Sequence, residues 1–372
     1  MIYFDNAATT RIKPECVYDA FNYYVREIGT SPGRGSYKLG ITASRMLFQS
    51  RKTVGSFFGV PDPSNIIFTK NSTEAINLFF RGYLKKGDHV LISPFEHNAV
   101  LRPLHRMQQQ GIIEYSVVQI NSLNNFELLK AFIKPNTKLA SITLASNLTG
   151  QIVFNSKTAR FLKESGVFVF VDTSQGAGKI KLDLTNDSID ALAFTGHKDL
   201  LSFPGVGGLV SHDALTIEPL IQGGTGVFGD SYTNPDVYPD AYESGTLNMP
   251  AIWSLKKAID YLNDNFNEIK EAEQKLISYL LSQLKKIKGI EIYSLDAARV
   301  STVCFNIRGI KSNEVVKHLS DNDICVRGGI HCAILAHKAI NTVQTGAVRV
   351  SINYNNTEKE IDQFIKVLKE LT

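Results

Sequence analysis

The sequence predicts an α/β fold, in which a large domain with a seven-stranded, mostly parallel sheet is joined to a smaller α+β domain. Short β-branched or aromatic runs alternate with helical patterns between residues 66 and 210, as they do in a parallel sheet. Near residue 252 the pattern changes to one long amphipathic stretch. The chain has 372 residues, and a single hydrophobic core usually stops growing at roughly 250 to 300 residues.

The first elements are a polar loop and a helix. Glycine and proline in residues 31–36 predict the loop, and the apolar spacing predicts a helix over residues 41–58. Seven strands are expected near residues 66–69, 89–93, 116–120, 139–143, 168–171, 191–194 and 207–210. The last two strands are too close in sequence for a helical crossover. At least one antiparallel neighbour must therefore interrupt the parallel order.

The carboxy-terminal elements predict the smaller domain. The amphipathic stretch begins at Ile252, and the expected strands lie near residues 290–293, 302–307 and 348–352. A helix is expected after Ser312, and Thr357 and Glu360 have the spacing of a capping box that opens a last helix. We therefore expect residues 15–250 to form the large domain, and residues 1–14 and 251–372 to form the small one.

Composition and charge are those of an ordinary folded protein, with 43% hydrophobic and 20% charged residues. The net charge of +4, from 40 basic and 36 acidic residues, gives no indication of nucleic-acid binding. No apolar stretch approaches the roughly 20 residues needed to cross a bilayer, so no membrane partner is expected. Four cysteines without CxxC spacing, and a start without a basic and apolar leader, predict a reducing, cytoplasmic location.

Lys198 is the most informative residue for chemistry. It follows a short apolar strand, and Asp172 and Gln175 follow the strand before it. The carboxyl ends of strands in an open α/β sheet meet at one ligand-binding edge. A lysine there can hold the aldehyde of pyridoxal phosphate, while a carboxylate keeps the ring nitrogen protonated and the ring an electron sink. The alternative for a lone Asp172 is an aspartate that only caps the following turn.

Further polar groups follow other predicted strands. Asn71 and Glu74 have capping-box spacing, and Ser72 and Thr73 would add hydroxyl groups to the free amides of a helix start, which is a site for a phosphate. An ordinary capped helix without a ligand is the alternative. His97 follows a strand and could stack on a planar ring, or be a hydrogen-bonding loop residue. Asn147 follows a further strand as another candidate at the rim of the same site.

Cys332 is the second singular feature, because it lies in a glycine-containing segment beside His331 and near Arg327. Positive neighbours favour the nucleophilic thiolate. A zinc site formed by His331, Cys332 and His337 lacks a fourth ligand at a suitable spacing, so no metal is expected. Arg349 lies on a predicted strand and could bind a substrate carboxylate if it points inward. Otherwise it lies on the solvent face.

Taken together, these segments resemble the class V aminotransferase family of fold type I pyridoxal-phosphate enzymes. Within that family they resemble the cysteine desulfurases with a short catalytic loop, group II, which are similar to selenocysteine lyase. The resemblance covers nearly the whole chain. It rests on residues 3–10, 71–77, 96–97, 146–147, 172–175, 195–198 and 327–332, together with Arg349.

The resemblance implies roles for the residues around the cofactor. Lys198 would bind pyridoxal 5'-phosphate as a Schiff base, Asp172 would bind the ring nitrogen, and Gln175 would contact the ring hydroxyl. His97 would stack on the ring. The phosphate would be held by Ser72, Thr73, Thr195 and His197, and by Thr246 of a partner subunit. An obligate homodimer follows from that last contribution.

The resemblance also implies the reaction. Asn147, Arg327, His331 and Arg349 would hold the substrate, and Cys332 would take sulfur from L-cysteine as a persulfide while L-alanine is released. The persulfide would pass to a sulfur-acceptor protein, for iron–sulfur clusters or another sulfurated product. A selenocysteine lyase, or another carbon–sulfur lyase or epimerase of the family, stays open as the alternative, and so does a non-catalytic sulfur-relay scaffold. Ile334 stands where the family often has proline, and residues 223–242 have little that matches the family.

Overall fold

The computed structural model describes residues 1–33, 35 and 37–372. The predicted polar loop over residues 31–36 includes Arg34 and Ser36, which lie outside these described residues. Within them, no helix is both long enough and apolar enough to cross a bilayer.

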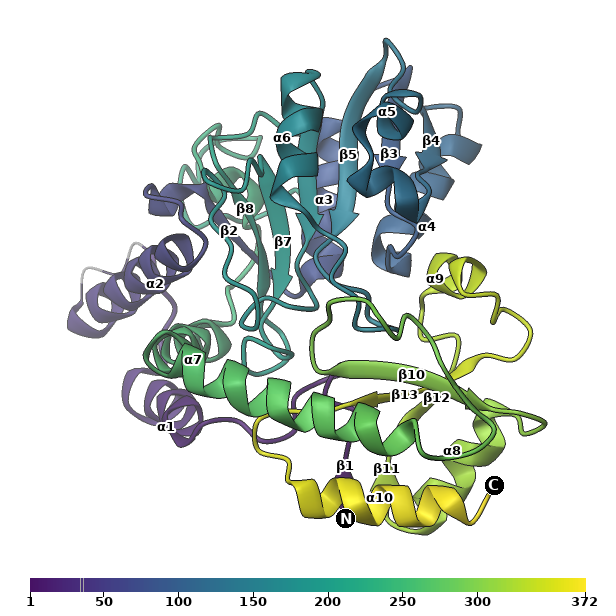
Figure 1. The fold of residues 1–372 in the computed structure, drawn as a ribbon. Helices are drawn as coiled ribbons and strands as arrows, with labels where there is room; N and C mark the ends of the chain where they lie inside the picture. Colours follow the sequence, from purple (N-terminus) through teal and green to yellow (C-terminus); the bar gives the residue numbers. More distant parts are fainter. Residues whose placement is uncertain (34, 36) are drawn as a thin grey trace.

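A seven-stranded sheet lies at the centre of the larger part of the molecule (Figure 1). The strands are β2 (Ile66–Thr69), β3 (Asp88–Ile92), β4 (Ile113–Val117), β5 (Thr137–Thr143), β6 (Phe168–Asp172), β7 (Ala191–Thr195) and β8 (Gly207–Ser211). Their order in the sheet is β2-β8-β7-β6-β5-β3-β4. Strand β8 is antiparallel to both β2 and β7, and the remaining pairs are parallel. This topology confirms the predicted fold class and the predicted antiparallel interruption.

Both faces of this sheet are buried, which explains why its strands are almost continuously apolar. In β6, Val169 and Val171 pack into one hydrophobic cluster, whereas Phe170 packs into the cluster on the opposite face. The helices of this part of the chain are α1 (Glu15–Tyr23), α2 (Lys38–Phe57), α3 (Ser72–Tyr83), α4 (Asn98–Gln109), α5 (Phe126–Lys130) and α6 (Ser156–Glu164), with a π-helical turn η1 (Tyr24–Ile28) after α1. The side chains of α2 and α6 belong to the first cluster, and those of α3 and α4 to the second.

One strand prediction was misplaced. The run 116–120 was expected to form a strand, but β4 occupies Ile113–Val117 and a 3-10 helix follows at Ile120–Asn124. Strand β4 is an edge strand, which among the described residues pairs only with β3, and only its first residue, Ile113, is buried. An edge strand needs little apolar sequence, so the stronger apolar run lay past its end.

The carboxy-terminal part begins with α7 (Met249–Leu284), a helix of 36 residues that contacts α1, α2 and α10. An antiparallel sheet follows in the order β12-β13-β10-β9, formed by β12 (Arg327–Gly329), β13 (Ala347–Ser351), β10 (Thr302–Ile307) and β9 (Ile290–Ile292). It is accompanied by α8 (Ser312–Asp321), α9 (Ile334–Ala339) and α10 (Glu358–Lys369). Thr357 and Glu360 form the predicted capping box at the start of α10.

The first residues of the chain pack against this carboxy-terminal part (Figure 1). Strand β1 (Ile2–Tyr3) is parallel to β11 (Ile324–Cys325), and Asp5 bridges to Ser351 at the end of β13. A separate hydrophobic cluster includes Phe4 together with residues of α7, α8 and α10. On these contacts we keep the two-domain division, 15–250 against 1–14 and 251–372, as a proposal.

Candidate active site

Asp172 and Lys198 lie at the carboxyl ends of two adjacent parallel strands. Asp172 is the last residue of β6, and Lys198 lies three residues after the end of β7. Asp172 is only 2% exposed. Its Oδ1 accepts hydrogen bonds from the backbone N–H of Ser174 at 2.9 Å and from the Ser174 hydroxyl at 2.5 Å. No hydrogen bond from another described residue reaches its second carboxylate oxygen, which stays available to a ligand.

The side chain of Lys198 is half-buried. Burial lowers its pKa from the ordinary value, and the charge of Asp172 opposes this effect, while Arg349 adds to it. A lysine with a lowered pKa has more of the neutral amine, which is the form that can attack an aldehyde. The environment of Lys198 thus suits Schiff-base chemistry.

His97 caps the start of α4 and is neutral. Its Nδ1 accepts a hydrogen bond from the backbone N–H of Ala99 at 3.0 Å, so its proton lies on Nε2. Burial, together with the charge of Lys198, lowers the pKa of His97 to about 4. A neutral, fixed imidazole beside Lys198 and Asp172 is suited to stacking on a planar ring.

The sequence alone gave no indication that Glu96 is a buried residue of the site. It is fully buried, and its Oε1 accepts hydrogen bonds from the Ser93 hydroxyl and the Thr143 backbone N–H, both at 2.6 Å. Its Oε2 has no partner among the described residues. Burial raises the pKa of Glu96 to about 8, with a further contribution from Asp172. Glu96 is therefore a neutral carboxylic acid at pH 7, next in sequence to His97.

The start of α3 supplies hydrogen-bond donors. Asn71 caps the helix by accepting from the Glu74 N–H at 3.0 Å. The reciprocal half of the predicted capping box is absent among the described residues, because the Glu74 carboxylate accepts from the Lys70 N–H instead. The hydroxyl oxygens of Ser72 and Ser174 lie 2.7 Å apart in a hydrogen bond, which joins this helix start to Asp172, and Thr73 is exposed beside it.

Two further predicted phosphate donors, Thr195 and His197, carry unsatisfied polar atoms. Thr195 Oγ1 and His197 Nδ1 are buried without a hydrogen-bond partner in the described part of the chain. Burial lowers the pKa of His197 to about 4, so its ring is neutral and can donate one hydrogen bond. Thr246 is exposed and lines a cavity of about 420 Å³ together with Asn71 and His197. A buried carboxylate, an amine and orphaned donors in one place form the donor set that pyridoxal phosphate requires, so the residues present fit this cofactor.

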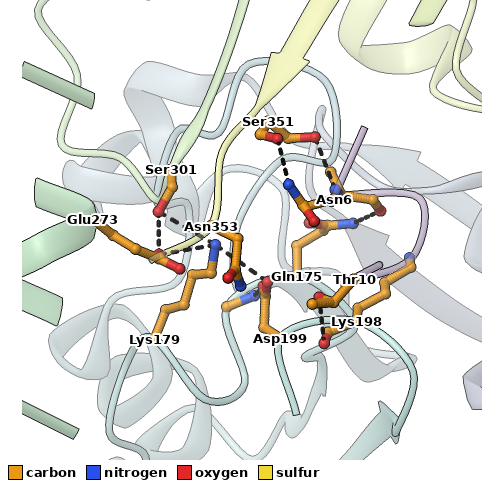
Figure 2. A network of polar contacts seen from close by, with 12 residues as sticks. Asn6, Thr10, Gln175, Lys179, Lys198, Asp199, Glu273, Ser301, Ser351 and Asn353 are labelled. Carbon is orange, nitrogen blue, oxygen red and sulfur yellow. Dashed lines mark hydrogen bonds and ion pairs between the residues drawn. The ribbon is translucent and has the colours of Figure 1, made fainter. Parts of the chain in front are cut away.

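Gln175 and the amino-terminal segment complete this side of the site (Figure 2). The Gln175 side-chain N–H donates to the Ala7 carbonyl at 2.7 Å, which leaves its amide oxygen out of this contact. The hydroxyl of Thr9 donates to the carbonyl of His197, and that of Thr10 to the carbonyl of Lys198 at 2.8 Å. Residues 7–10 thereby fix the backbone carbonyl groups of His197 and Lys198.

Cys332 is exposed and lies in a turn between β12 and α9. Both His331 (φ 54°) and Cys332 (φ 53°) adopt the left-handed conformation, which side-chain-bearing residues rarely take. The His331 carbonyl accepts from the Asn147 side chain at 2.7 Å, and the Cys332 carbonyl accepts from the Asn98 N–H at 2.9 Å. The loop that follows β5 and the first residue of α4 therefore hold the cysteine turn on the side of the large sheet.

His331 does not supply the positive neighbour that the sequence suggested. Its ring stacks on the His337 ring with centroids 5.9 Å apart, and its Nε2 lies 3.2 Å from the Arg327 carbonyl. Burial, reinforced by Arg349, lowers the pKa of His331 to about 3. The imidazole is therefore neutral, and Arg327 is the remaining cation of this segment. Among the described residues, no group of three potential ligands could hold a metal ion.

Arg349 points inward and is 3% exposed, so the solvent-face alternative is wrong. Its Nη1 donates to the Asn147 carbonyl at 2.9 Å, and its Nη2 donates to Asp5 Oδ1 at 2.6 Å. Arg327 binds the other oxygen of Asp5 at 2.8 Å. The Arg349 Nε has no partner among the described residues, which leaves a donor for a carboxylate. Asp5 belongs to the motif of residues 3–10, but its contacts with Arg327 and Arg349 could not be predicted from the sequence.

The comparisons with known proteins agree with this geometry. A family model described as Aminotransferase class-V matches residues 2–364. Together with the fold, this match defines the class of the protein as a fold type I pyridoxal-phosphate enzyme, as predicted. The chain belongs to the class V aminotransferase family.

Its relatives and structural neighbours carry a narrower description. A probable cysteine desulfurase of Methanothermobacter thermautotrophicus is 32% identical, with 100% of this chain and 94% of the relative covered. Another probable cysteine desulfurase, from Borreliella burgdorferi, is 30% identical, with 100% and 93% covered. The apo structure of a cysteine desulfurase from Thermococcus onnurineus NA1 superposes with a TM-score of 0.91 at 29% identity, covering 100% of this chain and 94% of that one. An S-sulfonic acid form of the Escherichia coli cysteine desulfurase CsdA gives a TM-score of 0.87 at 26% identity, covering 99% and 94%.

Proposed function

We propose that the protein is a pyridoxal-phosphate-dependent cysteine desulfurase that converts L-cysteine to L-alanine and forms a persulfide on Cys332. The observation that carries the proposal is the position of Cys332. Its exposed turn is held by Asn147 and by Asn98, the residue next to His97, so a thiol lies beside the residues around Lys198. The printed names of the full-length relatives support the same activity.

The proposed residues bind the cofactor ring, its phosphate or the substrate carboxylate, according to the chemistry of each side chain. Bound pyridoxal phosphate supplies an electron sink for the pair released at the substrate α-carbon. Lys198 would hold the cofactor and move the α-proton of the substrate. Asp172 would bind the ring nitrogen, Gln175 would contact the ring hydroxyl, and His97 would stack on the ring. Ser72, Thr73, Thr195 and His197 would hold the phosphate. Arg349, next to Asn147 and Arg327, binds the substrate carboxylate.

Cys332 accepts the sulfur atom of the substrate. Its thiolate attacks the sulfur of the substrate, so an S–S bond forms while the Cβ–S bond breaks. The electron pair of the broken bond stays with the substrate carbon, which takes up a proton, and alanine leaves. The exposure of Cys332 then leaves the persulfide accessible to a protein acceptor.

A homodimer forms part of the proposal. Thr246 is exposed. Large apolar side chains are also exposed on α1 and α2, just before α2, and in the loop that follows β8: Tyr23, Phe48, Tyr37, Phe228 and Tyr232. Exposed large apolar side chains are frequent at subunit interfaces. A second subunit would place its own Thr246 at the phosphate site. Analytical ultracentrifugation of the wild type, with cofactor retention measured in Thr246→Ala, tests this arrangement, and a cofactor-loaded monomer would contradict it.

The test of the reaction uses Cys332→Ser. We expect this variant to lose sulfide release from L-cysteine in the presence of a reductant, while it keeps the visible absorbance of the bound cofactor. Cys325→Ser is the matched control, because Cys325 lies in β11 and should be dispensable. Full turnover in Cys332→Ser would rule out the persulfide mechanism. A colourless protein that takes up no cofactor would rule out the enzyme class and favour a scaffold.

The same assay, run with L-selenocysteine, addresses the second candidate. A selenocysteine lyase would release selenide in Cys332→Ser as well, since selenium can leave without a protein thiolate. The membership of the short-catalytic-loop group, the acceptor protein and the cytoplasmic location also belong to the proposal, and they are supported by the resemblance and by the cysteine pattern of the sequence.

A further inference from the structure

A buried group of three charged residues lies next to the segment that carries Lys198 (Figure 2). Lys179 Nζ lies 3.2 Å from Asp199 Oδ1 and 3.0 Å from Glu273 Oε2. The three side chains, in the order Lys179, Asp199 and Glu273, are 11%, 4% and 5% exposed. Charges are rarely kept this far from water without a specific arrangement of partners.

Asp199 connects this group to both cofactor-binding segments. It follows Lys198 in the chain, and its Oδ2 accepts a hydrogen bond at 2.9 Å from the N–H of Gly176, the residue after Gln175. The turn that contains Gly176 also packs directly on the Asp199 backbone, because a Cβ at Gly178 would lie 2.3 Å from the Asp199 carbonyl oxygen. Lys179, at the other end of this turn from Gly176, also binds the Asp199 carboxylate. Asp199 therefore holds the Gln175 segment against the Lys198 segment.

Glu273 connects the same group to the carboxy-terminal part. It lies in the middle of α7, accepts the Ser301 hydroxyl, and also accepts the Tyr354 N–H at 3.2 Å. Ser301 directly precedes β10, whose Cys304 pairs with Arg349 in β13. Lys179 donates to the Ser301 hydroxyl at 3.2 Å as well. One ammonium group thus joins the cofactor side of the site to the sheet that carries the substrate-binding arginine.

The charges in this group are unequal, with one cation facing two carboxylates. Asp199 is adjacent to Lys198, and its negative charge raises the pKa of the Lys198 amine, against the lowering by burial. An ammonium 3.2 Å from Asp199 offsets that negative charge locally. The other charged or titratable groups around Lys198 come from separate elements, and they are Asp172, Arg327, Arg349, His97 and His197.

We propose that Lys179 is a positioning residue for Lys198: by binding and neutralising Asp199, it fixes the Lys198 segment and keeps the Lys198 amine in its neutral, nucleophilic form. The proposal rests on the proposed function only in taking Lys198 as the residue that binds the cofactor. Lys179 does not belong to the residues proposed to hold the substrate or the cofactor. It acts through Asp199 and is anchored by Glu273.

The test measures the Lys198 amine itself. The rate at which acetic anhydride labels Lys198 in the cofactor-free protein is followed against pH, with the labelled site read by mass spectrometry. Lys179→Met is the main variant, because it keeps the side-chain length and faces a cavity of about 660 Å³ that accommodates it. Lys181→Met is the matched control, since Lys181 lies in the same segment, is exposed, and packs over Phe266 instead.

In Lys179→Met, we expect the labelling midpoint of Lys198 to move upward by roughly one pH unit, which is the usual effect of one nearby charge. Asp199→Asn keeps an acceptor for Gly176 and removes the charge, so its midpoint should move downward. In the double variant the midpoint should return close to that of the wild type, and Lys181→Met should not change it. In the cofactor-loaded enzyme, Lys179→Met should lower kcat more than it raises KM, and Lys179→Arg should restore kcat.

A purely structural role would give a different result. Lys179→Met would then lower the unfolding temperature while the labelling midpoint stays at the wild-type value, which would overturn the proposal. If Lys179→Met does not fold, an unchanged midpoint in Asp199→Asn would overturn it equally. The labelling needs no turnover, so failure of the desulfurase assay and failure of this inference are separate outcomes.

Discussion

Glu96→Gln is the substitution whose effect the structure predicts most sharply. Glu96 is buried without water contact, and its pKa of about 8 means that the folded protein keeps this carboxyl protonated at pH 7. In the unfolded chain the same carboxyl loses its proton near pH 4.3. The unfolded state thus binds fewer protons than the folded state between these two values. Stability must therefore fall as the pH rises through this window.

The magnitude follows from the slope of this linkage. One proton of difference corresponds to about 1.4 kcal/mol of unfolding free energy per pH unit. Between pH 5.5 and 7.5 the wild type should therefore lose about 2.5 kcal/mol relative to Glu96→Gln. The glutamine can still accept the hydrogen bonds from Ser93 and Thr143, and any cost of its unpaired N–H groups does not depend on pH.

The assay is urea unfolding of both proteins at pH 5.5 and at pH 7.5, and the readout is the change in their stability difference. Histidine titration is common to both proteins and cancels in this difference. Glu114→Gln is the control, because Glu114 is exposed and its hydrogen bond to Lys134 lowers its pKa, so it stays ionised throughout. A stability difference for Glu96→Gln that is the same at both pH values would refute the assignment of a neutral Glu96.

Three further predictions concern other parts of the site and the fold. Arg349→Lys should raise the KM for L-cysteine by roughly tenfold or more, because a lysine cannot form the bidentate fork to a carboxylate. Asn147→Ala should free the His331 carbonyl, so that iodoacetamide labels Cys332 faster while kcat falls by roughly a hundredfold. Thr357→Ala should lower the unfolding free energy by about 1 kcal/mol through loss of the capping box, with activity unchanged.

Each of these has a result that would contradict it. For Arg349→Lys, it is a normal KM with a reduced kcat, which would move the arginine away from carboxylate binding. For Asn147→Ala, it is an unaltered labelling rate of Cys332, which would mean that Asn98 alone fixes the turn. For Thr357→Ala, the helix cap is misjudged if urea unfolding shows no loss of stability. Thr372→Ala is the control there, as that hydroxyl lies at the exposed chain end.

The strands of the large sheet could be predicted because burial on both faces forces continuous apolar runs, as in β6. The edge strand β4 could not, because only one of its sides is paired and its sequence IEYSV contains polar residues. The order of the strands in the sheet has no local signal at all. It depends on which crossovers the helices make, and no spacing in the sequence reports that.

The candidate site also combines features that local sequence predicts with features that it does not. Lys198, Asp172 and Cys332 could be singled out because each lies after a strand or in a glycine-containing segment with chemically unusual neighbours. The contact of Asn147 with the His331 carbonyl joins residues 184 positions apart, and that of Glu273 with Lys179 joins two separate parts of the chain. The burial of Glu96 was likewise not visible, since the sequence around it resembles an ordinary polar loop. Long-range contacts and protonation states come only from the packed structure.

The pairing of β1 with β11 has a consequence for synthesis of the protein. The backbone of residues 2–6 bonds to residues 323, 325 and 351, while Asp5 binds Arg327 and Arg349. A ribosome reaches those partners only after more than 300 further residues, which takes on the order of tens of seconds. Until then, residues 2–6 cannot form these native contacts. Arg327 and Arg349, which we propose to bind the substrate, can therefore meet their carboxylate partner Asp5 only after the intervening residues have been synthesised.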